Sequence, residues 1–249
     1  MQKIGLISGT VPIQSGEQKS VYTDYGFPSS PLSFFTLGEI TFIHINRHGQ
    51  DNQIPPHKIN NHANILALKE QGVSQIIGIS SCGIINKNIQ LGSLVLPHDF
   101  IDFSHPTFYD KERYHISLSD PFCPALRKEV IKTLESLEIP FSTNAVVICP
   151  RGPSLETRAE IYAFAKLGAD LVTMTCSKEA ILAKELGLCY ASICTADNLA
   201  QAEDNLEISE IISSAKQSSK NITKLLEALS PTDKNCACID APEKGKFIS

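Results

Sequence analysis

An arginine and a histidine stand side by side in "INRHG" (Ile45–Gly49), where an apolar run ends. Neither side chain gains from packing at such a position. Arg47 would present a planar fork of N–H donors that suits a phosphate group, and His48 would add a further donor. Taken alone, the pair is better explained as a surface arginine and a histidine that caps a turn. With partners from other segments, the chemistry it indicates is the binding of an anion.

Hydroxyl groups and glycines follow two other apolar runs. In "LISGTV", Gly9 and Thr10 could offer backbone N–H groups and a hydroxyl to an anion, although a plain turn explains them at least as well. In "GISSCGII", Ser80 and Ser81 end a buried run where Val or Ile would pack better. The sequence therefore favours a functional role for the two serines.

A fourth group of candidate residues lies in the segments "RGPSLETRAEI" and "DLVTMTCSKEA". Glu156 or Thr157 is expected to cap the helix that follows the first segment, which is a sufficient structural role for both. Met174 and Thr175 end the apolar run of the second segment. A methionine at such a place more often fills a gap in the core than lines a pocket.

The elements that position these side chains are expected from apolar runs that alternate with segments of helical periodicity. Strands are expected at Ile4–Ile7, Thr41–Asn46, Gln75–Ser81, Ser93–Leu96, Ala145–Cys149, Asp170–Thr173 and Tyr190–Cys194. Helices are expected at Asn60–Gln71, Pro124–Leu137, Glu156–Leu167, Lys178–Leu186 and Ile208–Leu229. Gly72, Gly168 and Gly187 are expected to end helices in the left-handed conformation. The alternation predicts an α/β fold: a single domain, residues 1–229, with a central mixed, largely parallel β-sheet flanked by helices, and a loose tail over 230–249.

Composition excludes several classes of partner. The chain of 249 residues has 42% hydrophobic residues, enough for a full core, and a net charge of −5 that leaves no basic stripe for nucleic acid. No apolar run approaches membrane-spanning length, and the first strand begins within four residues of the N-terminus, which leaves no room for a signal peptide. We therefore expect a cytoplasmic protein that binds neither nucleic acid nor membrane.

Most of the eight cysteines lie in apolar runs such as "AVVIC" and "LCYASIC", where cysteine acts as a small hydrophobic residue. No Cys-x-x-Cys pair is present, so no metal site is expected. Cys236-Ala-Cys238 is the exception, and an inert tail is favoured there over a redox or metal site.

The order of the motifs resembles the trimeric purine nucleoside phosphorylase family, and within it the methylthioadenosine/methylthioinosine phosphorylase branch, from about Ile4 to Leu226. The segments that carry the resemblance are "RHG", "PPHKINNHANILALKEQG", "DPFCP", "GPSLETRAEI" and "MTCSKEAILAKELGLCYASI". The resemblance implies a nucleoside phosphorylase-like fold, a homotrimer, and phosphorolysis of a purine nucleoside to the free base and a ribose 1-phosphate. It implies no metal or organic cofactor, since phosphate is a substrate.

The resemblance also assigns site residues. It implies that phosphate is bound by Thr10, Arg47, His48, Ser80, Ser81 and Thr175. It implies that the nucleoside is bound by Cys82, Gly83, Leu155, Glu156, Thr173, Met174 and Asn198, with Ile208, Ile211 and Ile212 around the 5′ substituent and His115 entering from a neighbouring subunit. His48 and either Asn198 or Asp197 are the implied catalytic residues. Branched aliphatic side chains at the 5′ end suit a thiomethyl group, although the same three isoleucines would equally form the packed face of an amphipathic helix.

One position decides which base the family resemblance implies. Asp near the purine N7 tends to go with 6-aminopurines and Asn with 6-oxopurines. An alignment of "YASICTADNLAQ" without a gap puts Asn198 there, whereas a deletion of one residue would put Asp197 there. The first needs fewer assumptions, and an amide suits an oxopurine, so we favour a 6-oxopurine. A simple capping role for both residues is the structural alternative.

The sequence departs from the family at two loops. "SGTV" stands where the family has "GGTG" or "GGSG", and Ser154 in "GPS" replaces an arginine. The favoured prediction is a purine nucleoside phosphorylase of purine salvage that acts on 5′-methylthioinosine, inosine or guanosine. The alternatives are a methylthioadenosine phosphorylase that uses Asp197, a hydrolase in which water replaces phosphate, and a non-catalytic purine-binding or thiol-regulated relative.

Overall fold

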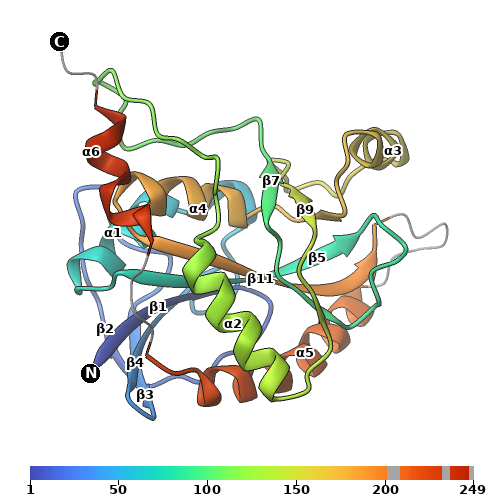
Figure 1. Ribbon diagram of the computed structural model, residues 1–249, viewed down its shortest axis with the longest axis horizontal. Coiled ribbons are helices and arrows are strands. Elements are labelled where there is room, and N and C mark those ends of the chain that lie inside the picture. Colours follow the sequence, from blue (N-terminus) through green and yellow to red (C-terminus); the bar gives the residue numbers. More distant parts are fainter. Residues whose placement is uncertain (201–207, 232–235, 247–249) are drawn as a thin grey trace.

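A mixed β-sheet runs through the whole molecule (Figure 1), in a computed structural model that describes residues 1–200, 208–231 and 236–246, with the side chains of 208–217 left out. Within these residues the sheet has 11 strands. Four of them form its parallel centre, in the order β4 (Ile40–Asn46), β1 (Gln2–Ser8), β5 (Gln75–Ile84) and β11 (Cys189–Leu199). The carboxyl ends of all four strands therefore meet at one edge, where open α/β sheets place their ligands.

The sheet divides at β5, which is long enough to pair with three neighbours. Its carboxyl end pairs antiparallel with β10 (Leu171–Val172), which continues the sheet through β9 and β7, while β11 leads to β6 and β8. Strands β3 and β2 extend the other side by antiparallel pairing. The remaining bounds are β2 Glu17–Lys19, β3 Leu32–Leu37, β6 Leu94–Val95, β7 Asp99–Ile101, β8 Phe141–Ser142 and β9 Val146–Ile148.

Helices cover both faces of the sheet. Buried residues of α1 (Asn61–Glu70) and α4 (Cys176–Glu185) belong to one hydrophobic cluster, and those of α2 (Pro124–Ser136) and α5 (Ile208–Ala228) belong to another on the opposite face. Helix α3 (Arg158–Lys166) lies at the periphery over a small cluster of its own. The predicted fold, a single α/β domain with a mixed, largely parallel sheet between helices, is confirmed.

All seven expected strands and all five expected helices are present, with ends that differ by a few residues. Gly72, Gly168 and Gly187 have φ of 80°, 87° and 72°, as expected for residues that end helices. Thr157 is the N-cap of α3 and forms a capping box with Glu160. The short strands β2, β3, β7 and β8 were not predicted, because runs of two to six residues without clear alternation carry little periodic signal.

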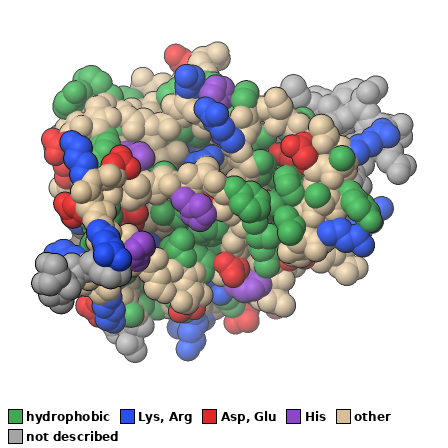
Figure 2. Space-filling model, turned by 90° about the horizontal axis from the view of Figure 1, so that it is seen from above, with side chains coloured by type: hydrophobic (Ala, Val, Ile, Leu, Met, Phe, Trp, Pro, Cys, Tyr) green, Lys and Arg blue, Asp and Glu red, His purple; other side chains and the backbone are tan. Residues whose placement is uncertain are grey.

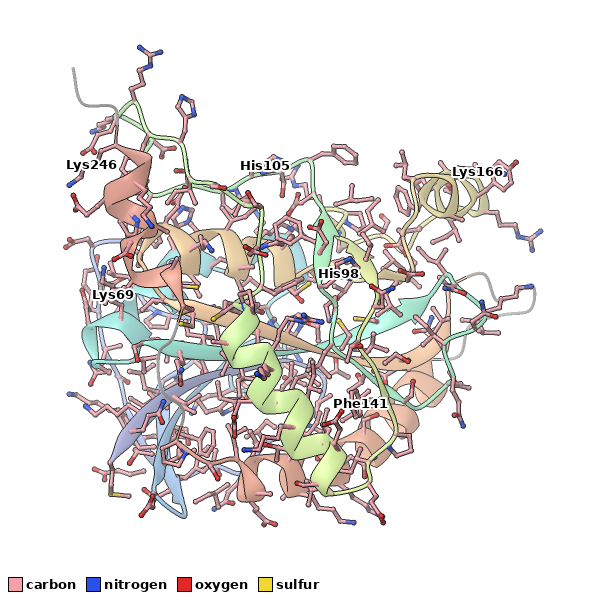
Figure 3. All side chains as sticks on the ribbon, in the orientation of Figure 1. Lys69, His98, His105, Phe141, Lys166 and Lys246 are labelled. Carbon is pink, nitrogen blue, oxygen red and sulfur yellow. The ribbon has the colours of Figure 1, made fainter. Side chains whose placement is uncertain are left out.

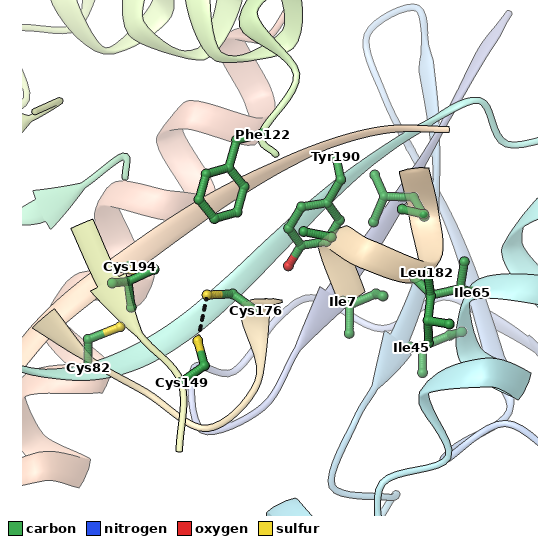
Figure 4. Close-up of a cluster of buried hydrophobic side chains, with 14 of the residues drawn as sticks. Ile7, Ile45, Ile65, Cys82, Phe122, Cys149, Cys176, Leu182, Tyr190 and Cys194 are labelled. Carbon is green, nitrogen blue, oxygen red and sulfur yellow. Dashed lines mark hydrogen bonds between the residues drawn. The ribbon is translucent and has the colours of Figure 1, made fainter. Parts of the chain in front are cut away.

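Buried cysteines in and beside the sheet behave as small apolar residues, as predicted. Cys82, Cys149, Cys176 and Cys194 are buried in the cluster that also contains Phe122 and Tyr190 (Figure 4). The Sγ atoms of Cys149 and Cys176 lie 3.6 Å apart. Burial raises the pKa of the Cys149 thiol well above its usual value, so it stays a neutral, inert side chain.

The expectation of a loose tail is wrong for its described residues 236–246. This segment forms the 3-10 turn η2 (Ala237–Asp240) and the helix α6 (Ala241–Gly245), and Cys238 is buried. Residue Lys246 forms an isolated β-bridge with Tyr114. A segment without helical periodicity can still be ordered where a few side chains pack against the core, and here the cysteine side chains do so.

Charges are interspersed on the face that Figure 2 shows, where Lys and Arg side chains alternate with Asp and Glu. Among the described residues, every helix is too short or too polar to cross a lipid bilayer.

A buried histidine makes the stability of the fold depend on pH. His44 in β4 is paired with the hydroxyl of Ser8, 2.8 Å from its Nε2, and burial followed by the charge of Arg47 lowers its pKa to about 4. The unfolded chain therefore binds this proton first, and the stability that neutral His44 contributes is complete above pH 6.5 and is lost as the pH falls to about 4.

We expect His44→Gln to remove this part of the pH dependence. Between pH 6.5 and 4 the free energy of unfolding of the parent should fall by up to about 3 kcal/mol more than that of the variant, measured by urea denaturation at several pH values. Parallel profiles for parent and variant would show that His44 does not titrate in this range.

Candidate active site

A cavity of about 350 Å³ opens at the carboxyl ends of the central strands. It is lined by Thr10, Arg47, His48, Pro56, Ser81, Cys82, Gly83, Leu155, Glu156, Val172, Thr173, Met174, Thr175, Asn198, Leu199 and Ala200. Segments that are far apart in the sequence therefore meet here, as the order of the parallel strands requires. The volume lies at the lower end of the range of small-molecule sites.

Arg47 enters this site with its charge already compensated. Its Nε donates to Oε1 of Glu179 at 2.7 Å and its Nη2 to Oε2 of Glu179 at 3.2 Å, and both side chains are almost fully buried. Two further N–H groups bind the backbone oxygens of Ile79 (2.6 Å) and Ile7 (3.1 Å). Burial alone would lower the pKa of Arg47, but the charge and hydrogen bonds of Glu179 raise it, so the guanidinium stays charged.

Tyr190 completes this buried group from strand β11. Its hydroxyl donates to Oε2 of Glu179 at 2.7 Å, and Figure 4 shows its ring beside Phe122. Burial and the negative charge of Glu179 raise the pKa of Tyr190, which keeps the phenol protonated as a donor. The hydroxyl fits only because position 78 is a glycine: a Cβ added to Gly78 would lie 1.8 Å from it. Residues of β1, β5 and β11 thus hold the charge pair between Arg47, which follows β4, and Glu179 of α4.

His48 presents a lone pair rather than a charge. Its Nδ1 lies 2.7 Å from the carbonyl oxygen of Ile54, which can only accept, so Nδ1 carries the proton and Nε2 is free to accept. Burial, together with the nearby charge of Arg47, lowers the pKa of His48, so the ring is neutral at pH 7. Gly9 packs against this ring, because a Cβ there would lie 2.7 Å from Cδ2 and 3.0 Å from Nε2 of His48.

Hydroxyl groups gather on the same side of the cavity. Thr10, Ser81, Thr173 and Thr175 all line it, and Thr173 donates to the backbone oxygen of Ser81 at 3.0 Å. Ser80 lies behind them: it is buried, it does not line the cavity, and its Oγ is 3.0 Å from Oγ1 of Thr175. Ser80, which was expected at the anion, thus contacts Thr175 in this structure.

A β-bulge near the end of β11 separates the two candidate base-reading residues. The register against β5 shifts between Ala196, which pairs with Cys82, and Asn198, which pairs with Gly83. Asp197, the extra residue, is buried, accepts from Oγ1 of Thr195 at 2.5 Å and does not line the cavity. Asn198 lines it, and its Nδ2 lies 3.2 Å from the backbone oxygen of Leu199.

At the two loops where the sequence departs from the family pattern, the side chains of Ser8 and Ser154 do not line the cavity. The Ser8 side chain points into the interior toward His44, so it adds nothing to the anion side. Ser154 and Arg151 are exposed and do not line the cavity. A cis peptide bond joins Gly152 to Pro153, and Met174 packs against Gly152, where a Cβ would lie 2.3 Å from its sulfur.

The structure leaves the expected 5′ residues untested in a single chain whose description omits the side chains of 208–217. Ile208, Ile211 and Ile212 belong to α5, but their side chains lie outside the described part of the chain. His115 does not line the cavity, and its backbone N–H donates to Gly245 at 3.1 Å.

The sequence analysis missed several residues of the site. Pro56, Val172 and Leu199 line the cavity without any chemical signal of their own. Glu179 and Tyr190, which hold Arg47, were also missed, because "SKEAILAK" has the pattern of an ordinary helix and its glutamate needs a cationic partner only once the fold buries it.

Comparison with known proteins agrees with this geometry. Residues 3–230 match the family model described as the phosphorylase superfamily. A probable S-methyl-5′-thioinosine phosphorylase of Methanopyrus kandleri is 35% identical over 98% of both chains. A 6-oxopurine nucleoside phosphorylase of Pyrococcus furiosus is 36% identical over 97% of this chain and 98% of its own. Methylthioadenosine phosphorylase from Schistosoma mansoni in its apo form superposes with a TM-score of 0.87 at 26% identity, covering 98% of this chain and 96% of that one.

We expect the buried charge pair to control stability. Glu179→Gln should lower the free energy of unfolding by about 3–5 kcal/mol, because it leaves the Arg47 guanidinium buried without its counter-charge. Tyr190→Phe should cost about 1 kcal/mol, since it removes one hydrogen bond to Glu179. Urea denaturation measures both, with Glu135→Gln, an exposed glutamate of α2, as the neutral control. Equal stabilities for the Glu179 and Glu135 variants would contradict the assigned role.

Proposed function

The chain belongs to the phosphorylase superfamily, and within it to the methylthioadenosine/methylthioinosine phosphorylase branch of the purine nucleoside phosphorylases; from this premise we propose that it cleaves 6-oxopurine nucleosides with phosphate, 5′-methylthioinosine foremost. Its products are the free base and a ribose 1-phosphate that carries the 5′ substituent. The observation that carries the proposal is that Asn198, and not Asp197, lines the cavity.

Phosphate binds among the hydroxyl and N–H groups on one side of the cavity. Four of the five N–H groups of Arg47 are directed to Glu179, Ile7 and Ile79, which leaves one N–H on Nη1 for the anion. Glu179 also cancels most of the positive charge of Arg47. Neutral donors such as Thr10 and Thr175 therefore contribute much of the binding of phosphate. Fixed donors of this kind orient the anion without a large reorganisation when the reaction occurs.

A neutral His48 suits the monohydrogen form of phosphate. The free lone pair on Nε2 accepts a hydrogen bond from the P–OH group, while the remaining phosphate oxygens take the donors of the strand ends. This arrangement turns one oxygen of the anion toward the sugar carbon that it attacks. Positioning of the nucleophile in a closed site is worth several kcal/mol of the barrier.

Asn198 recognises the departing base. Cleavage of the glycosidic bond passes through an oxocarbenium-like state in which negative charge moves onto the purine. The amide can donate to N7 or O6 of a 6-oxopurine and accept from its N1–H, depending on its orientation. A donor at N7 stabilises the leaving base, which lowers the barrier to C–N cleavage.

The proposal extends to the 5′ end of the nucleoside and to the oligomer. Ile208, Ile211 and Ile212 at the start of α5 and His115 of a neighbouring subunit enclose a 5′-thiomethyl group, and the site is then completed in a homotrimer. A thiomethyl group needs no hydrogen-bond partner in an apolar pocket, whereas a buried 5′-hydroxyl does.

Two other functions are less well supported. A methylthioadenosine phosphorylase that uses Asp197 would require that buried carboxylate to leave Thr195 and reach the cavity. A hydrolase would have no use for the donor groups that Thr10, Arg47 and Thr175 place along one side of the cavity.

We expect phosphate-dependent release of hypoxanthine from 5′-methylthioinosine, and slower release of adenine from 5′-methylthioadenosine. Asn198→Asp should lower kcat/KM for the 6-oxopurine by about 100-fold, because a carboxylate cannot donate to N7 or O6, and should shift the preference toward the 6-aminopurine. Chromatography of the released bases, with inosine, guanosine and adenosine included, measures both effects.

Asp197→Asn is the matched control for this substitution, since it changes the neighbouring residue outside the cavity. Its base preference should equal that of the parent. Adenine release that exceeds hypoxanthine release in the parent, or a base preference that follows position 197, would reject the assignment of Asn198.

The phosphate side can be tested through Gly9. In Gly9→Ala the new Cβ would displace the His48 ring and press on Nη1 of Arg47, which lies 3.1 Å from it. We expect kcat/KM for phosphate to fall by about 100-fold with little change in the melting temperature. Gly38→Ala serves as the control: at φ of 56° it strains the backbone, but the added Cβ meets nothing within 4 Å, so stability should fall while the phosphate kinetics stay those of the parent. A Gly9 variant with the phosphate kinetics of the parent would exclude this anion site.

A further inference from the structure

Four cysteines that are far apart in the sequence come together beside the first residue of β11. Cys123 is the N-cap of α2, Cys189 is the first residue of β11, and Cys236 and Cys238 lie at η2. All four Sγ atoms lie within 4.8 Å of one another. In this structure all four are free thiols. Such a convergence of four sulfur atoms is not needed to fill a core, where single cysteines suffice.

The dimensions of the cluster fit a tetrahedral thiolate site. Four sulfurs at about 2.3 Å from a zinc ion lie about 3.8 Å from one another. In the structure the Sγ atoms of Cys189 and Cys236 are 3.3 Å apart and no pair exceeds 4.8 Å, so small side-chain movements reach that geometry. Cys123, Cys189 and Cys238 are buried, whereas Cys236 is half-buried and offers an ion a path from solvent.

The surroundings offset the negative charge that such a site carries. Nζ of Lys184 lies 4.0 Å from Sγ of Cys238 and is held by the backbone oxygen of Asp120 at 3.1 Å. Cys123 stands at the N-terminus of the 13-residue helix α2, where the helix dipole favours an anion.

The cluster stands apart from the candidate active site. None of its residues lines the cavity at the opposite, carboxyl end of β11. Figure 3 shows Lys246, which follows α6, and Lys166 of α3 on opposite sides of the molecule. The position of the cluster therefore does not indicate a function in the reaction. It indicates that the cluster fastens the C-terminal segment to the core, because Cys236 and Cys238 bring that segment against β11 and α2.

We propose that Cys123, Cys189, Cys236 and Cys238 bind one Zn²⁺ ion in a tetrahedral thiolate site that anchors residues 236–246 to the start of β11. Binding releases the thiol protons to solvent and forms four Zn–S bonds, with no change of oxidation state. Zinc is the common divalent ion that prefers four thiolates, and a fully ligated site of this kind stabilises the fold.

The first experiment measures metal and thiols in the full chain, purified with reductant and without chelator. We expect about one zinc ion per chain by elemental mass spectrometry, and a visible tetrahedral thiolate spectrum when Co²⁺ replaces zinc. The double variant Cys236→Ser/Cys238→Ser should lose more than about nine-tenths of the zinc and melt at a lower temperature. Cys194→Ala, which removes a buried thiol from the same strand as Cys189 but outside the cluster, should keep the metal.

The parent protein alone can overturn the proposal, whether or not the variants fold. Eight free thiols with no zinc bound after dialysis against Zn²⁺ would exclude the site. An intact mass lower by about two or four hydrogen atoms, mapped by peptide analysis to these four cysteines after purification without oxidant, would show disulfide bonds in place of metal and would also exclude it.

Discussion

The buried ion pair between Arg47 and Glu179 is the constraint on which the arrangement of the site depends. A charge pair taken out of water is stable only if its remaining donors and acceptors are satisfied, and here the backbone of β1 and β5 and the hydroxyl of Tyr190 satisfy them. The pair therefore fixes α4 to the parallel centre of the sheet, through Arg47 at the end of β4 and Tyr190 in β11. The same geometry leaves a single N–H of the guanidinium at the cavity, so a group that would be a strong isolated cation acts there mainly as an oriented donor.

Local backbone features aim the other side chains. Glycine at position 9 lets the backbone pass close to the ring of His48. The hydrogen bond from His48 to Ile54 fixes which ring nitrogen faces the cavity. The bulge in β11 turns Asn198 outward and Asp197 inward, although the two are neighbours in the sequence. The amide and the carboxylate thus acquire different environments from a single extra residue in one strand.

The fold and most cavity residues were predictable because both follow from periodic patterns. Apolar runs locate the parallel strands, their carboxyl ends meet at one edge, and polar residues after those ends, such as Thr10 and His48, must then converge. The partner of Arg47 could not be assigned, since Glu179 lies 132 positions away within an unbroken helical period. The position of Ser80 behind Thr175 could not be predicted either. The direction of each side chain near the end of β5 depends on the pairing of β5 with both β10 and β11.

The cluster of four cysteines was even harder to predict from the sequence. Metal sites are found in a sequence by short ligand spacings, and this chain offers only Cys236-Ala-Cys238, which by itself indicates little. The other two sulfurs come from a helix start and a strand start, which the topology of the sheet makes neighbours. Strand β11 therefore has a sulfur cluster at its first residue and Asn198 near its last. The pairing of β11 with β5 runs from Cys189 to Leu199, so one paired strand connects the sulfur cluster with the bulge and with Asn198.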